Sequence, residues 1–236
     1  MSKKLKIILG IIVIVLVLGI VGYFIWQGTG AKVTKDSIKF KEEYEAINAK
    51  YNSSNNKKYI SINIKENNPV KYSSYDEIFE VLESGTGVIY FGFPECPWCR
   101  NLVPVLTDSA LENGIKTVYY LNILEDRDIK ELKTTGTGKK KKTTIVTTKE
   151  GTPEYHKLLG ILADFMSEYK GLNDESIKRI YLPTVVFVKD GKILGTEDSL
   201  ESYAKRVDGN AYEPMNTEEK AALAKVFKTY YTKIKK

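Results

Sequence analysis

The two cysteines of this chain, Cys96 and Cys99, lie three positions apart within the segment FGFPECPWCR. Such a pair can be half of a metal site, a structural crosslink or a redox-active dithiol. A structural zinc site needs four ligands, commonly thiolates and imidazoles, and the single histidine, His156, lies far along the chain. Zinc is therefore disfavoured and we expect no cofactor, although a Cu(I) carrier stays an alternative because Cu(I) binds two soft thiolates.

A structural role for the crosslink is also disfavoured, because a disulfide that closes so short a loop removes little chain entropy. Cys96 directly precedes Pro97, which suits the first position of a helix. Unpaired N–H groups at a helix N-terminus stabilise a thiolate. Cys99, one turn later, would then be placed to break a mixed disulfide. The spacing favours a redox dithiol in which Cys96 is the nucleophile and Cys99 the resolving thiol.

The segments around this pair predict an α/β fold in which strands and helices alternate. We expect strands at 59–64, 87–93 and 115–123, helices at 75–83 and 97–112, a β-hairpin at 182–196 with Asp190 and Gly191 in its turn, and a C-terminal helix from Thr217. The segment 124–178 interrupts this order as an insertion. It is expected to carry its own helix from Pro153 to Gly171, and the four lysines at 139–142 are expected in a solvated loop.

The N-terminus predicts a membrane anchor. Residues 7–26 contain no charged side chain, and this length suits a single helix across a bilayer. Lys3, Lys4 and Lys6 precede the run, so the positive-inside rule retains that end in the cytoplasm. We therefore expect a single-pass cell-membrane protein whose C-terminal domain is extracytoplasmic.

The resulting division of the chain has four parts. They are a cytoplasmic N-terminus at 1–6, a transmembrane signal anchor at 7–26, a linker and N-terminal helix at 27–58, and a folded domain at 59–236. Without Lys3, Lys4 and Lys6, the net charge of +6 falls to +3 for the part beyond the anchor, which is too small to indicate a nucleic-acid partner.

The segments around the cysteine pair resemble those of the thioredoxin superfamily. The resemblance rests on the strand VIYFGF, the loop PECPWC and the helix RNLVPVL, and on Pro104 within that helix. The segment YLPTVVFVKDGK resembles the one that holds a cis-proline beside the dithiol, which makes Pro183 the candidate. The implied architecture is a thioredoxin-like fold, a central mixed sheet flanked by helices, here with a helical insertion and an N-terminal transmembrane helix.

More narrowly, the chain resembles membrane-anchored thioredoxin-like proteins of Gram-positive bacteria, some of them described as bacteriocin transport accessory proteins. The resemblance implies a membrane-tethered, extracytoplasmic thiol–disulfide oxidoreductase with Cys96, Cys99 and Pro183 as its catalytic residues. Its partners would be cysteine-containing secreted or membrane proteins and a membrane or thiol redox partner. The alternative is a non-enzymatic accessory protein for an exporter, and the direction of electron flow stays open.

One position departs from the thioredoxin pattern. Thioredoxins bury an acidic residue six positions before the first cysteine, and this chain has Tyr90 there. Tyrosine is a poor base at neutral pH, so proton transfer would use water or Glu95. Pro97 and Trp98 form the dipeptide that helps to set the reduction potential, and we expect Trp98 to be exposed to an extended substrate segment.

Overall fold

The computed structural model describes residues 32–236. The predicted segments 1–6 and 7–26, and the beginning of the predicted linker, lie outside the described residues. Within 32–236, no helix combines the length and the apolar composition that a membrane span requires.

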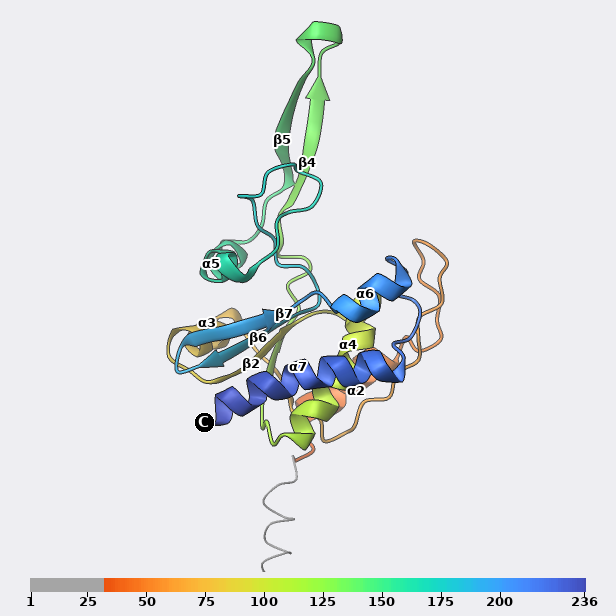
Figure 1. The fold of residues 1–236 in the computed structure, drawn as a ribbon, viewed down its shortest axis with the longest axis vertical. Coiled ribbons are helices and arrows are strands. Elements are labelled where there is room, and N and C mark those ends of the chain that lie inside the picture. The colour runs from red at the N-terminus through yellow and green to blue at the C-terminus, as the bar shows by residue number, and fades with distance from the viewer. Residues whose placement is uncertain (1–31) are drawn as a thin grey trace, which may run out of the picture.

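A five-stranded mixed sheet forms the centre of the molecule (Figure 1). Its strands lie in the order β1-β3-β2-β6-β7. The first three are parallel to one another, and β6 and β7 are antiparallel to their neighbours. This sheet, flanked by helices, fits the expected thioredoxin-like fold. The strands are β1 (Val70–Tyr72), β2 (Gly87–Phe91), β3 (Val118–Leu121), β6 (Thr184–Lys189) and β7 (Lys192–Glu197).

Helices cover both faces of the sheet. On one face lie α2, α4 and α7, and α3 and α5 lie on the other. The predicted helix at 75–83 is confirmed and has Ser74 as its N-cap, and the predicted helix that begins at Pro97 is confirmed as well. The helices are α2 (Lys35–Glu45), α3 (Tyr75–Glu83), α4 (Pro97–Glu112), α5 (Pro153–Leu162), α6 (Glu201–Val207) and α7 (Thr217–Lys235), with short 3₁₀ turns η1 (Gly138–Lys140) and η2 (Ala163–Phe165).

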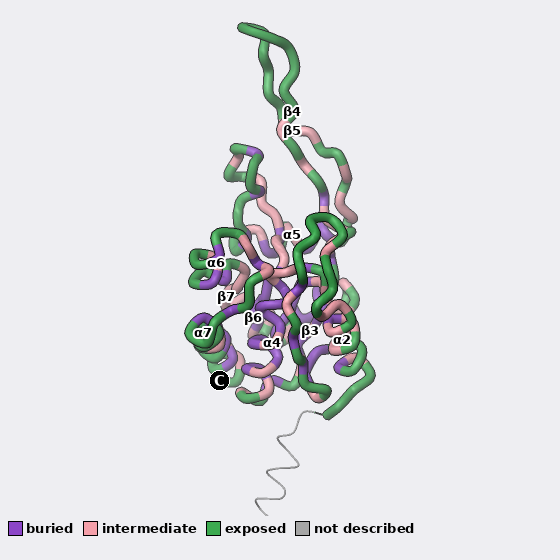
Figure 2. The backbone as a smooth tube through the Cα atoms, turned by 90° about the vertical axis from the view of Figure 1, so that its right-hand side faces the viewer, coloured by how far each residue is buried: buried purple, intermediate pink, exposed green. Residues whose placement is uncertain are grey.

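The central strand β2 supplies side chains to both cores, because all five of its residues are buried. Val88 and Tyr90 point into the core under α2, α4 and α7, whereas Ile89 and Phe91 point into the core under α3 and α5. Successive strand residues face opposite sides of a sheet, so a strand covered on both faces has no polar position. Figure 2 shows the buried backbone concentrated in this central part of the fold.

The predicted strand at 59–64 is wrong, although its alternating burial is real. Ile62 and Ile64 are buried, but their N–H groups donate to side chains of the α2 region rather than to a strand. Ile62 N donates to Asn48 Oδ1 at 3.0 Å and Ile64 N donates to Glu45 Oε1 at 2.7 Å. Side-chain acceptors thus replace a neighbouring strand, and β1 takes the edge position instead.

The insertion differs from its prediction in two ways. Its helix α5 begins at Pro153 behind the Thr152 cap, as predicted, but ends at Leu162 rather than at Gly171. The segment expected as a loop forms a separate two-stranded hairpin of β4 (Ile129–Thr135) and β5 (Lys142–Lys149). The β-branched run TTIVTT favours a strand, but the loop prediction followed the four adjacent lysines instead.

Two glycines with nearly the same backbone conformation allow the cost of left-handed backbone to be distinguished from the cost of a steric clash. Gly191 in the β6–β7 turn has φ +71°, and a Cβ there would lie 2.3 Å from Glu83 O. Gly114 has φ +68° and open space around it. We predict that Gly114→Ala costs about 1–2 kcal/mol, the penalty of left-handed backbone. Gly191→Ala is expected to cost roughly 3 kcal/mol or more, because the backbone clash adds to that penalty.

Chemical denaturation of the two variants measures this difference. Equal losses in the free energy of unfolding would show that the contact between the β6–β7 turn and the end of α3 adjusts without cost.

Candidate active site

The register of the sheet brings the dithiol and Pro183 together at the end of the sheet where β2 finishes and β6 begins. Phe91, the last residue of β2, is paired with Thr184, the first residue of β6. The active-site loop that follows Phe91 therefore lies beside the residue that precedes Thr184. The Leu182–Pro183 peptide bond is cis, as predicted. The thiol of Cys96 donates to Leu182 O at 3.5 Å, so the two loops are in contact.

Cys96 is the N-cap of α4, as its position before Pro97 predicted. Its sulfur accepts a hydrogen bond from the backbone N–H of Cys99 at 3.2 Å. Helix N-termini leave N–H groups without intrahelical partners, and here one of them is directed at the sulfur. A thiolate at Cys96 is stabilised by this bond and by the helix dipole.

Cys99 lies beneath Cys96 and is fully enclosed. Its side chain is 0% exposed and that of Cys96 is 4% exposed. Burial raises the pKa of the Cys99 thiol well above its usual value, and the neighbouring Cys96 raises it further. The Phe93 backbone and the Tyr90 side chain lower the pKa of Cys99, but their effect is smaller than that of burial. Cys99 is therefore held as a neutral thiol near neutral pH.

Tyr90 reaches from the sheet to the floor of the active-site loop. Its hydroxyl lies 2.8 Å from that of Tyr44, and both side chains are completely buried. A Cβ at Gly92 would lie 2.1 Å from the Tyr90 hydroxyl, so this position must be glycine while Tyr90 is in place. Burial raises the pKa of Tyr90 and of Tyr44 well above that of free tyrosine. Both phenols stay protonated and act as hydrogen-bond donors rather than as bases.

Sequence reasoning found Tyr90 but missed Tyr44 as a site residue. The predicted N-terminal helix agrees with the burial of the Tyr44 ring in α2, but it does not reveal the contact that the Tyr44 hydroxyl makes. The ring of Tyr120 stacks on Tyr90 with centroids 5.5 Å apart. A hydroxyl that approaches from another element has no local sequence signal, because only the packing of α2 on the sheet places it there.

Arg100 is a second residue that the sequence did not single out. It directly follows Cys99, is 0% exposed and makes no ion pair within residues 32–236. Its guanidinium donates to Tyr44 O at 2.6 Å, to Ile60 O at 2.8 Å and to Asn48 Oδ1 at 2.5 Å. These bonds join α4 to the α2 region and to the 59–64 segment. Burial lowers the pKa of Arg100, and the surrounding oxygens offset the cost of enclosing its charge.

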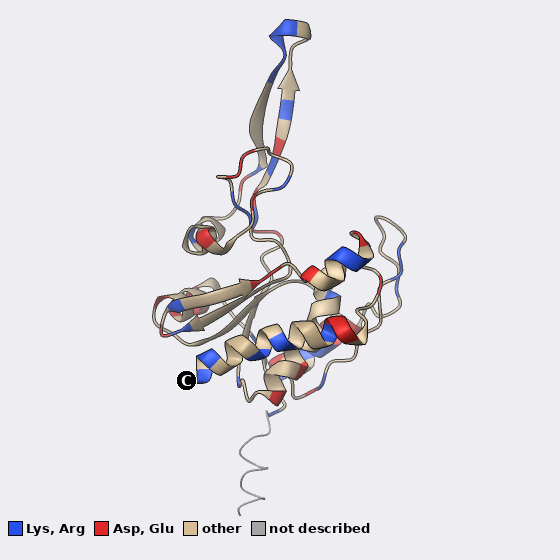
Figure 3. Cartoon of the chain, viewed as in Figure 1, with Lys and Arg blue, Asp and Glu red and all other residues tan. Residues whose placement is uncertain are grey.

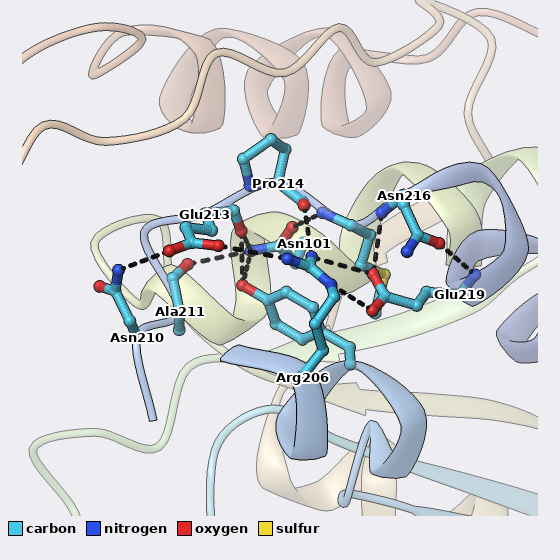
Figure 4. A network of polar contacts seen from close by, with 10 residues as sticks. Asn101, Arg206, Asn210, Ala211, Glu213, Pro214, Asn216 and Glu219 are labelled. Carbon is cyan, nitrogen blue, oxygen red and sulfur yellow. Dashed lines mark hydrogen bonds and ion pairs between the residues drawn. The ribbon is translucent and has the colours of Figure 1, made fainter. Parts of the chain in front are cut away.

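Asn101 connects the other side of α4 to the C-terminal part of the chain (Figure 4). Its side-chain amide donates to Tyr203 OH at 2.8 Å and to Ala211 O at 3.0 Å, and its oxygen accepts from Met215 N at 2.9 Å. Arg206 continues this network with a bond of 2.6 Å from its Nε to a Glu219 carboxylate oxygen. The first turns of α4, which carry the dithiol, are therefore held from two sides.

Glu95 and Trp98 occupy different environments from each other. Glu95 is exposed in the loop, and its carboxylate makes no hydrogen bond or ion pair within the described part of the chain. Trp98, expected to be exposed, is half-buried because its ring packs edge-on against Tyr203 at 5.4 Å. It lines a groove of about 450 Å³ together with Pro183, the insertion residue Lys170 and the Asp198 carboxylate. Burial raises the pKa of Asp198 and the adjacent Glu197 raises it further.

A metal site was not expected around His156, which is exposed on α5. Among residues 32–236 no three His, Cys, Asp or Glu side chains gather in a group that could hold a metal ion.

Comparison with known proteins adds little to this geometry. No family model and no curated protein matches the chain. Among solved structures, it is similar to a thioredoxin-fold protein from Helicobacter pylori, with 19% sequence identity over 64% of this chain and 88% of that one. The TM-score of 0.24 is too low to support an argument, so the fold rests on the strand order and the site rests on its own contacts.

The enclosure of Cys99 predicts an asymmetric reaction with iodoacetamide. In the reduced protein, Cys96 should be alkylated before Cys99 at pH 7 to 8, because the raised pKa of Cys99 keeps its sulfur protonated. Alkylation of Cys99 should become fast only at a pH well above the one at which an ordinary cysteine thiol ionises. Mass spectrometry of Cys96→Ser and Cys99→Ser, each with one remaining thiol, gives the two rates. Indistinguishable rates at neutral pH would contradict the assignment of roles.

Proposed function

We propose that this protein is a membrane-tethered, extracytoplasmic thiol–disulfide oxidoreductase of the membrane-anchored thioredoxin-like type. The observation that carries the proposal is the position of Cys96, whose sulfur caps α4, accepts from Cys99 N at 3.2 Å and contacts the cis-proline loop at Leu182 O. A crosslink with only a structural role requires none of these features. They are the features that a nucleophilic thiolate needs.

The first step is attack by the Cys96 thiolate on a substrate disulfide. A bond forms between Cys96 Sγ and one substrate sulfur, the substrate disulfide breaks, and the other substrate sulfur leaves as a thiolate. The N–H of Cys99 and the helix dipole stabilise the attacking sulfur. Trp98 and Pro183 border the groove in which the chain flanking the substrate cysteine would lie.

In the second step Cys99 resolves the mixed disulfide. Cys99 Sγ forms a bond to Cys96 Sγ, the bond from Cys96 to the substrate breaks, and the Cys99 proton passes to the leaving substrate sulfur. Among residues 32–236, the buried core around Cys99 contains no carboxylate or lysine beside which negative charge on this sulfur would develop. The Tyr90 hydroxyl, itself hydrogen-bonded to Tyr44, is the donor that stabilises this charge.

The partners that follow from this chemistry are secreted or membrane proteins with cysteines, together with a membrane or thiol redox partner that restores the dithiol state. The anchor at 7–26 would hold the domain at the outer face of the cell membrane, where disulfides persist.

Trapping tests this proposal directly. Cys99→Ser should accumulate mixed disulfides with a cysteine-containing peptide disulfide, because the resolving thiol is absent. Cys96→Ser should form almost none, since its remaining thiol is buried and protonated. Adducts are detected as reductant-sensitive shifts on non-reducing gels of the membrane-embedded protein. If neither variant forms adducts and the wild type exchanges with no disulfide, the protein is a non-enzymatic accessory component instead.

Removal of the Tyr90 hydroxyl separates the two steps. Tyr90→Phe should slow resolution of a preformed glutathione mixed disulfide at Cys96 by about 10- to 100-fold, because a hydrogen bond to a charged group contributes roughly 1.5–3 kcal/mol. Attack by Cys96 on glutathione disulfide should keep its rate. Stopped-flow measurements resolve both steps.

The control is Tyr231→Phe. This buried tyrosine in α7 has a hydroxyl that donates to Leu106 O at 3.4 Å, on the same side of the sheet. It should leave both rates unchanged. Equal slowing of both steps by Tyr90→Phe would indicate a general loss of packing.

A further inference from the structure

The hairpin formed by β4 and β5, residues 129–149, projects from the body of the molecule (Figure 1). All twelve residues of its outer half, 133–144, are exposed, as the green end of the tube in Figure 2 shows. At about 3.4 Å per residue, the seven residues of β4 span about 24 Å. An isolated two-stranded ribbon is marginally stable in water, and the outer half of this one buries no side chain. Packing therefore does not account for its length, which points to a functional role.

The charge of the hairpin is predominantly positive (Figure 3). It contains seven lysines and a single glutamate, so its net charge of +6 equals that of the whole chain. Lys139, Lys140, Lys141 and Lys142 are consecutive at its tip, and its outer half contains no acidic residue. Such a tip attracts anionic surfaces from a distance.

The base of the hairpin is attached to the body. Asp128 is buried and pairs with Lys130, and the Lys130 N–H donates to Tyr169 OH at 3.1 Å. On the other strand, Lys149 pairs with Glu125 at 3.1 Å. These contacts fix the hairpin at its base, whereas the four lysines at its tip make no ion pair within residues 32–236.

The hairpin and the active-site loop lie at the same end of the sheet, the end at which β2 and β3 finish. β2 and β3 are parallel, and their last residues, Phe91 and Leu121, are paired. The active-site loop follows the first of these residues, and the segment leading into the hairpin follows the second. The described chain begins at the opposite end of the long axis from the hairpin tip (Figure 1). A macromolecule that reaches the dithiol at this end of the sheet is therefore also within reach of the hairpin.

We propose that the hairpin is a basic docking arm, which binds an acidic surface of the protein whose cysteine reacts with Cys96. This inference rests on the proposed function and names the partner's chemistry, an acidic patch at a distance from its reactive cysteine. The hairpin has no arginine or aromatic residue, which nucleic-acid interfaces use. Its outer half has no apolar side chain to enter a bilayer, and like charge disfavours a second copy of this chain.

The test uses synthetic peptides with one cysteine activated as a nitrothiobenzoate disulfide. A rigid polyproline spacer joins this cysteine to six glutamates or, in the matched peptide, to six glutamines. Polyproline extends about 3.1 Å per residue, so spacers shorter than, equal to and longer than about eight prolines cover the length of the hairpin. The reduced full-length protein in neutral detergent reacts with each peptide, and chromophore release gives the rate.

Two variants lose the same number of positive charges, one at the hairpin tip and the other at α7. The first replaces Lys139, Lys140, Lys141 and Lys142 with glutamine. The α7 control replaces four exposed lysines within α7 and at its C-cap, Lys220, Lys225, Lys228 and Lys236, with glutamine.

The wild type and the α7 control should react about tenfold faster with the glutamate peptide than with the glutamine peptide at one spacer length, in low salt only. The hairpin variant should show no preference. Equal rates for both peptides at every spacer length, or the same loss in the α7 control, would overturn the docking role. Lysine-dependent binding to phosphatidylglycerol vesicles without a peptide preference would assign the hairpin to a lipid surface. Failure with every disulfide, glutathione disulfide included, would reject the oxidoreductase itself.

Discussion

The pairing of β2 with β6 is the constraint on which the candidate site depends. It places Phe91 opposite Thr184, and this single register sets the active-site loop against the cis-proline loop. A slip of one residue would turn Tyr90 from one core to the other, because strand side chains alternate between faces. The contact between Cys96 and Leu182 O follows from this register, and so does the placement of Tyr90 in the same core as Cys99. The site is a consequence of strand pairing between segments that are far apart in sequence.

Around this register the described part of the chain encloses polar groups but places no buried acid in the core that holds the dithiol. Arg100 donates to three backbone carbonyls and an amide oxygen, and the Tyr44 and Tyr90 hydroxyls share one hydrogen bond. Neutral phenols cost less to bury than a carboxylate, and they can still donate to a developing thiolate. This arrangement replaces a base with hydrogen-bond donors. Such a site assists the resolving thiol by stabilising its charge and leaves its proton to the departing sulfur.

The insertion changes what the site can meet. It follows β3 and precedes β6 along the chain, so it begins at the end of the sheet where the dithiol lies. One part of it, around Lys170, contributes to the groove beside Trp98, and another part extends outward as the lysine-rich hairpin. Close contacts and long-range charge are thereby combined on one side of the molecule. In the proposed function, the first would select the chain next to a cysteine and the second would select the protein that bears it.

The sequence by itself determined the features whose causes are local. The spacing of Cys96 and Cys99, the position of Pro97 and the β2, α3 and α4 elements follow from caps, apolar runs and helix dipoles, which act within a few residues. The roles of Tyr44 and Arg100 were decided only by the tertiary structure, because their hydrogen bonds join segments with no sequence proximity. The segment 59–64 shows the same limit, since its alternating pattern predicted burial correctly but could not reveal that side chains, not a strand, accept its N–H groups. Periodicity reports which side chains are buried, whereas the partner of each polar group depends on how the elements pack.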